Sequence, residues 1–447
     1  MISTVAEIEK AGIPAVGTVS EFMGDYVTTV KMRHRMPHLR TVVTPLPTED
    51  NVDDLAREIL PRLIAGLTTP LNEKERARDL IGQEKKSRVA FTGSYEECLA
   101  FLAGKSLCPP NGCPVVKSMT EQYTDGSGVI LPTPELVAKM LTGTSHSPDE
   151  RIGIMQPGGL EFTVEKVAIN AVMAGCKPEY LPVVLAIAKV LATEGERLSR
   201  GGPPNIWPVV SGPITREIGM DPVNFQGGLN PANKSIGRAV TLMVLNLGGG
   251  ASVLHTPQLN AFAEDVDSPW TLLGEDAGFR RDQSVACLIG GGNPDTSWHS
   301  AHLYQAEGPE TYLHRLSRQI ARMGQGGEFP TIVIYPPVAR DLIKTLGMTK
   351  ADVKQWLYEN TFWTKEEYEW RAWRDRPTPQ QIAGLADNAT IRVIGSAYNY
   401  RGKERGIENR PDDICIVVAG GESPYPFLCK GNETPYLRWI QSVDVWR

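Results

Sequence analysis

The segment 107–114 carries the side chains best suited to covalent chemistry. It reads Leu-Cys-Pro-Pro-Asn-Gly-Cys-Pro, so Cys108 and Cys113 flank a Pro-Pro-Asn-Gly turn. Asn-Gly favours the positive φ angles of a tight reversal, which would bring the two thiols together. Neighbouring thiols can form a redox pair, or one can be a nucleophile and the other its resolving thiol. The alternatives are two structural cysteines, or a metal pair that lacks further ligands at zinc-site spacing.

A second candidate begins at the turn that contains Gly158 and Gly159, which would offer backbone N–H groups to a substrate. Thr163 is a good N-cap for a helix over 164–174. This helix is apolar on nearly all sides, so we expect it to be buried.

The same helix carries Glu165, Lys166 and Asn170. Buried charges cost several kcal/mol unless they are paired or used, which favours acid/base groups in an active site. Cys176 lies eleven residues after Glu165, a spacing that places both on one helical face. The alternative is a capped helix whose charges reach the surface.

A third candidate is a Gly- and Asn-rich stretch that leads into an expected helix at about 235–246. Asn and Gly of this density before a helix predict a nest for an anion or an amide, although a plain helix-capping loop is an alternative. The stretch contains cations that could hold a carboxylate or a phosphate. The candidate substrate-binding residues are Arg216, Asn230, Asn233, Lys234 and Arg238.

The pattern of elements predicts an α/β fold with mixed or parallel sheets flanked by helices. Residues 1–75 predict a small N-terminal βα lobe, similar to part of a flavodoxin-like domain. The charge-rich residues 76–87 predict a linker helix, and 88–447 a main α/β domain, alternatively two subdomains that divide near 250–330. Strands are expected at 13–19, 39–43, 151–155, 284–289, 331–335, 391–395 and 413–418. Helices are expected at 5–10, 52–67, 164–174, 306–322, 336–345 and 350–359.

Composition narrows the class of protein. The net charge of −6 makes nucleic acid an unexpected partner. No run of about 18 uncharged apolar residues occurs, so we expect no membrane contact. The 7 scattered cysteines and the absence of a secretory signal predict a cytoplasmic protein. We expect a small-molecule substrate and a homo- or hetero-oligomer; the sequence identifies no cofactor and suggests no residues as metal ligands.

Several stretches resemble the UGSC family of selenocysteine- or cysteine-containing proteins, and more distantly the selenoprotein B component of glycine reductase. The U-G-S-C motif itself would precede Met1 and has no copy in this sequence. The resemblance therefore implies that a partner chain supplies the motif or that this branch has lost its chemistry. The similar stretches are 6–16, 19–22, 163–180, 211–238, 268–279, 332–360 and 414–421.

Three functions follow from these patterns. The first is a cysteine-dependent enzyme, oxidoreductase or nucleophilic, with Cys108, Cys113 or Cys176 as the thiol and Glu165 and Lys166 as acid and base. The second is a lyase or hydrolase that uses Glu165, Lys166 and Asn170 without a thiol. The third is a non-catalytic subunit whose partner carries the U-G-S-C motif.

Overall fold

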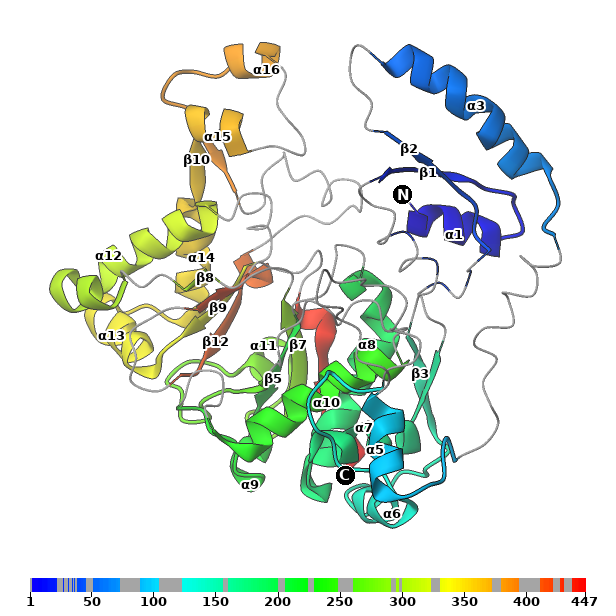
Figure 1. Cartoon of the computed structure of the whole chain (residues 1–447). Coiled ribbons are helices and arrows are strands. Elements are labelled where there is room, and N and C mark those ends of the chain that lie inside the picture. Colours follow the sequence, from blue (N-terminus) through cyan, green and yellow to red (C-terminus); the bar gives the residue numbers. More distant parts are fainter. Residues whose placement is uncertain are drawn as a thin grey trace.

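The computed structural model of the chain is shown in Figure 1. It describes residues 2–21, 27, 31, 34, 36, 38–45, 51–72, 89–103, 123–155, 160–199, 206–223, 229–247, 260–290, 295–296, 300–322, 330–371, 379–393, 411–420, 427–429 and 436–447. The expected linker helix at 76–87 lies outside these residues.

The N-terminal residues form a small βα unit, called the N-terminal lobe here. Its two strands, β1 (Gly17–Ser20) and β2 (Thr41–Thr44), pair in parallel, with α1 (Ile2–Lys10) before them and α3 (Val52–Thr68) after them. The lobe has an apolar core of its own. The buried side chains of this core are Val5, Ala6, Ala15, Val19, Val27, Met36 and Leu39.

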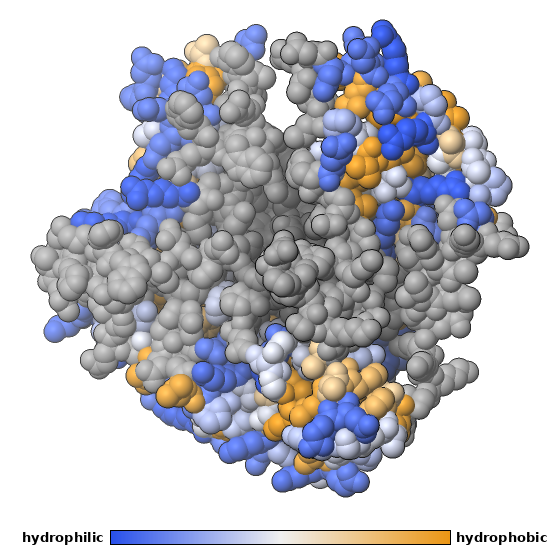
Figure 2. Space-filling model, in the orientation of Figure 1, coloured by the Kyte–Doolittle hydropathy of each residue, from blue (hydrophilic) through white to orange (hydrophobic). Residues whose placement is uncertain are grey.

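Helix α3 contributes no fully buried residue to the lobe. It packs on β2, yet Leu60, Ile64 and Leu67 are 56%, 52% and 43% exposed. Hydrophobic colours accordingly reach the surface over this lobe (Figure 2). The lobe thus presents an apolar helix face to solvent.

The largest core surrounds a mixed four-stranded sheet of order β14-β7-β5-β6. Strand β5 (Ile206–Ser211) pairs in parallel with β6 (Phe262–Ala263) and antiparallel with β7 (Val285–Gly290), which pairs antiparallel with β14 (Ile440–Ser442). Helix α8 (Leu181–Ser199) packs on three of these strands.

Two further helices complete this layer and position the candidate site. Helix α7 (Val164–Ala174) packs between α8 and α10 (Pro231–Leu247). It begins where the Thr163 side chain accepts the Lys166 N–H, and it ends at Gly175, whose φ of 83° is left-handed. The antiparallel hairpin β3 (Arg151–Met155) and β4 (Leu160–Thr163) leads into it.

A second four-stranded sheet has the order β12-β9-β13-β8. Strands β9 (Thr331–Ile334) and β12 (Cys415–Val418) pair in parallel and are buried at every position. Strands β13 (Phe427–Cys429) and β8 (Asp295–Thr296) continue it antiparallel.

Alternation along β9 and β12 assigns their two faces to two cores. Val333 and Val417 join the core around the first sheet, whereas Ile332 and Ile416 join a core covered by helices. This explains why both strands read as continuous apolar runs. The covering helices are α12 (Ser300–Arg322), α13 (Pro336–Leu346) and α14 (Lys350–Asn360).

The remaining elements are short. The hairpin β10 (Phe362–Thr364) and β11 (Thr390–Arg392) carries a small apolar cluster that includes Trp363. No helix in the described ranges is long and apolar enough to span a membrane. The other helices are α5 (Tyr95–Ala103), α6 (Pro134–Leu141), α9 (Ile214–Glu217), α11 (Leu273–Asp276), α15 (Lys365–Arg371) and α16 (Pro379–Ala383). The structure is an α/β fold, as predicted.

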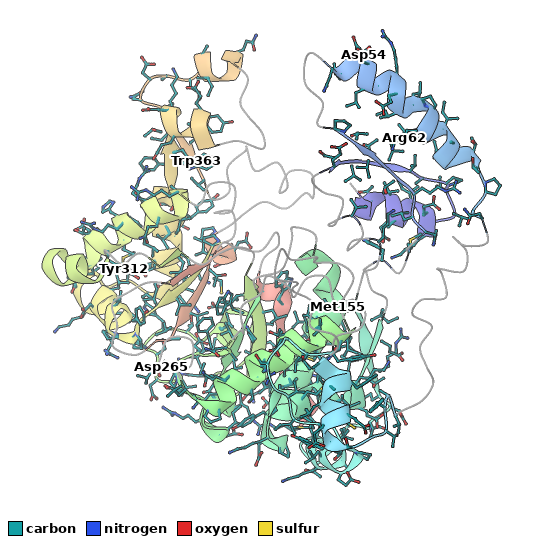
Figure 3. All side chains as sticks on the ribbon, viewed as in Figure 1. Asp54, Arg62, Met155, Asp265, Tyr312 and Trp363 are labelled. Carbon is teal, nitrogen blue, oxygen red and sulfur yellow. The ribbon has the colours of Figure 1, made fainter. Side chains whose placement is uncertain are left out.

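The two sheets are joined where β6 ends. The N–H of Asp265, labelled in Figure 3, donates to the carbonyl of Val418 at 2.8 Å. Just before it, Glu264 is fully buried, and its Oε2 accepts the N–H of Leu273 at 2.8 Å. Burial raises the pKa of Glu264, although the nearby ammonium of Lys350 opposes that rise.

A buried ion cluster lies beside this junction. The Nζ atoms of Lys350 and Lys354, on α14, lie 2.6 Å and 3.3 Å from Oδ2 of Asp276, at the end of α11. All three side chains are 10% exposed or less. Lys350 also donates to the carbonyl of Thr271 at 3.1 Å. Burial lowers the pKa of Lys354, and the carboxylate of Asp276 opposes that shift. Asp276 therefore pairs with two buried lysine side chains at once.

We expect Asp276→Ala to lower the free energy of unfolding by about 3–5 kcal/mol, because it leaves two buried ammonium groups without their carboxylate. Chemical denaturation followed by circular dichroism measures the change. Asp54→Ala is the matched control, since Asp54 pairs with Arg57 at 3.0 Å with both side chains mostly exposed. Equal losses in the two variants would contradict the role assigned to the cluster.

Candidate functional site

A pocket of about 460 Å³ opens between the end of α7 and the first two turns of α10. It combines two cations, a hydroxyl and an amide with small apolar side chains. The described residues that line it are Ala174, Gly175, Pro231, Lys234, Ser235, Arg238 and Asn260. The pocket falls within two of the stretches that the sequence singles out.

Asn230 begins α10 by capping it. Its Oδ1 accepts the N–H groups of Ala232 at 2.9 Å and Asn233 at 3.1 Å, and its Nδ2 donates to the carbonyl of Gly219 at 2.8 Å. Pro231 follows at the first helical position, where its missing N–H costs nothing. Because these bonds use the donors at the helix start, the anion nest expected here is already filled by the cap.

Asn233 is fully buried and fixes two neighbouring segments to α10. Its Oδ1 accepts the N–H of Asp221 at 2.8 Å, and its Nδ2 donates to the carbonyls of Asp221 at 3.1 Å and Ala261 at 2.8 Å. These bonds use its whole amide, so Asn233 holds the walls of the pocket in place and does not face a ligand.

Lys234 and Arg238 are four residues apart and therefore lie on the same face of α10. Lys234 is exposed, and its ammonium makes no ion pair with a described residue. Arg238 is mostly buried and forms a bidentate pair with Asp125 at 3.0 Å and 2.8 Å. Lys234 is thus the pocket cation that can receive an anion.

Cys176 lies beside the pocket wall. Its thiol hydrogen-bonds to Ser235, but burial raises its pKa to about 12. The residue as a whole is partly exposed, yet the sulfur itself is desolvated against the main core. The thiol is therefore protonated near neutral pH, which does not suit it to act as a thiolate nucleophile in this conformation.

Glu165 and Lys166 lie at the other end of α7. Nine residues of helix separate Glu165 from Ala174 in the pocket wall, roughly 13 Å along the axis. The ammonium of Lys166 donates to the carbonyl of Glu161 at 3.2 Å. The helix also ends at Gly175, before Cys176, so the shared helical face expected for Glu165 and Cys176 does not form.

Asn170 is buried midway along α7, where it bridges two helices. Its Nδ2 donates to the carbonyl of Lys166 at 2.9 Å, and its Oδ1 accepts from Nδ2 of Asn246, on α10, at 2.8 Å. The Asn170 side chain therefore joins α7 to α10 by hydrogen bonds. Arg216 also lies apart from the pocket and pairs with Asp267 on the surface.

Cys108, Cys113, Gly158 and Gly159 lie outside the described residues. The two ends of the stretch that holds the cysteines nevertheless meet, because the N–H of Tyr123 donates to the carbonyl of Leu102 at 3.0 Å. The Tyr123 carbonyl also accepts from Asn246 at 3.1 Å. Leu102 and Tyr123 therefore lie beside the end of α10 at Asn246, which is eight residues of helix from Arg238, or roughly 12 Å along the axis.

Two residues of the site lie outside the segments that the sequence patterns single out. Asn260 reaches the pocket from a segment that meets α10 only on folding. Asp125, in an Asp-Gly-Ser-Gly stretch, shows its importance only through the contact with Arg238, 113 residues away. Among the described residues, no group of three or more His, Cys, Asp and Glu side chains could hold a metal ion.

Comparisons of the chain with protein-family models, curated proteins and solved structures find no match. The function of the chain must therefore be inferred from the geometry of the pocket and from the residues around it.

Cys176 should react slowly with iodoacetamide, because at pH 8 a thiol with a pKa of about 12 holds on the order of a thousandfold less thiolate than an ordinary cysteine. Its rate should still rise with pH above 9. Mass-spectrometric mapping of alkylation over time measures both, with partly exposed Cys98 as the internal reference. Equal rates at the two cysteines would show that the Cys176 thiol is activated.

Proposed function

We propose that this chain binds a small molecule bearing a carboxylate or phosphate group in the pocket between α7 and α10. The observation that carries the proposal is the exposed ammonium of Lys234, which makes no ion pair with a described residue and faces a pocket of about 460 Å³. This volume falls in the range of roughly 300–1,000 Å³ usual for ligand sites. Ser235 and Asn260 would orient the polar part of the ligand, and Ala174 and Pro231 would contact its apolar part.

The bonds around the pocket support a preformed site. Asn230 and Asn233 hold the start of α10 through bonds of 2.8–3.1 Å, and Asn170 sets the spacing between α7 and α10. A preformed site loses less conformational entropy on binding than a mobile one. These residues therefore raise the affinity for a ligand by holding the pocket in its binding shape, whereas Lys234 raises it by attracting the negative charge of the ligand.

A second proposal is that the chain is an enzyme whose reactive thiols are Cys108 and Cys113. It is favoured by the contact between Leu102 and Tyr123, the described residues that flank the two cysteines in the sequence, because Tyr123 also bonds to Asn246 on the helix that lines the pocket. The protonated state of Cys176 supports the same choice of thiols. Glu165, Lys166 and Asn170 bond within the helix layer, and we assign them no catalytic step.

Lys234→Ala should weaken the binding of small carboxylates or inorganic phosphate by about tenfold or more, since it removes the charge-assisted contact. Isothermal titration calorimetry with acetate, butyrate, succinate and phosphate measures this. Lys234→Arg should retain most of the affinity, and Lys344→Ala, an exposed lysine on α13, should leave it unchanged. No binding of any probe to the native chain, or equal affinities in all variants, would reject the proposal.

If Cys108 and Cys113 form the reactive pair, the chain purified in air should be two hydrogen atoms lighter than the same chain after reduction. Peptide mapping should place the disulfide at these two residues. Cys108→Ser and Cys113→Ser should each abolish the mass difference, whereas Cys176→Ser should not. No disulfide, together with slow alkylation of both thiols in the reduced chain, would contradict the second proposal.

A further inference from the structure

Arg238 lines the pocket, but its charge is already neutralised. Its Nε donates to Oδ2 of Asp125 at 3.0 Å, and its Nη2 donates to Oδ1 of the same carboxylate at 2.8 Å. Nη2 also donates to the carbonyl of Ser127 at 3.1 Å. The two charged side chains are only 18% and 6% exposed, so water screens this pair weakly. A bidentate pair of this kind is not given up readily to a ligand.

Apart from Arg238, Lys234 is the one charged side chain among the described residues that line the pocket. Among the described residues, two cations and one carboxylate therefore leave a single positive charge at the site. Lys177, near the end of α7, lies over the ring of Tyr180 at 6.0 Å and is not among the described lining residues.

We propose that the pocket selects small molecules with one carboxylate over dianions of similar size, and that Asp125 sets this selectivity. This inference rests on the proposed anion site and adds the charge class of its ligand. One carboxylate neutralises Lys234 and leaves the pocket without net charge. A second negative group would lose water without gaining a free cation, because Asp125 already occupies Arg238.

Asp125 is therefore a specificity-determining residue that acts through Arg238. It also ties the 123–130 stretch to α10, and the N–H of Ile130 donates to the carbonyl of Met173 near the pocket. Asp125→Asn keeps the size of the side chain and one acceptor oxygen while removing its charge. The variant releases the second positive charge of the pocket to a ligand.

The test compares butyrate with succinate, which have four carbons each but one and two carboxylates. Isothermal titration calorimetry at low ionic strength and pH 7.5 measures both affinities. In the native chain butyrate should bind at least about fivefold more tightly than succinate. Asp125→Asn should shift the affinity ratio toward succinate by about tenfold. Asp267→Asn, which removes a carboxylate from the surface pair with Arg216, should leave the ratio unchanged.

The outcomes separate the two proposals. Tighter binding of succinate to the native chain would overturn monoanion selectivity while anion binding stands. An unchanged ratio in a folded Asp125→Asn variant, checked by its thermal transition, would overturn the role of Asp125. If that variant does not fold, the comparison on the native chain still decides the selectivity. Binding of neither probe, nor of phosphate, would reject the anion site itself and this inference with it.

Discussion

The contact between Asp276 and the two lysines of α14 is the constraint on which the joining of the two sheets depends. Two ammonium groups share one carboxylate out of contact with water, so loss of Asp276 would leave two buried charges without a partner. Asp276 lies at the end of α11, which comes after β6 of the first sheet in the chain. Lys350 and Lys354 both lie on α14, one of the helices that cover the second sheet. The Asp265–Val418 bond and buried Glu264 lie at the same junction. Polar bonding and apolar packing therefore hold the sheets together in one place.

The helix layer on the first sheet uses its polar residues in another way. Asn230, Asn233 and Asn170 place their amides between segments, so that backbone groups are satisfied and the distance between α7 and α10 is set. The pocket lies where this layer ends, because Gly175 terminates α7 and Asn230 starts α10. A site at the ends of two rigid helices needs little reorganisation to receive a ligand.

In and beside the pocket, neighbouring groups change the charge that a side chain can offer a ligand and the reactivity of a thiol. Arg238 is a cation in the sequence, but the Asp125 carboxylate makes it part of the wall and leaves Lys234 to carry the charge of the site. Cys176 is a thiol beside the pocket, but desolvation raises its pKa to about 12 and removes its nucleophilic character near neutral pH. Both effects come from neighbours distant in sequence, and both narrow the chemistry that the site can perform.

The sequence by itself determined the α/β class and most elements, because apolar periodicity, caps and glycine stops act over a few residues. It also indicated that α7 is buried. Only the tertiary structure decided that Asn170 and Asn233 bond to other segments and that Asp125 neutralises Arg238. These outcomes depend on pairings across up to 113 residues, and local patterns carry no information about which distant partner a polar side chain meets on folding.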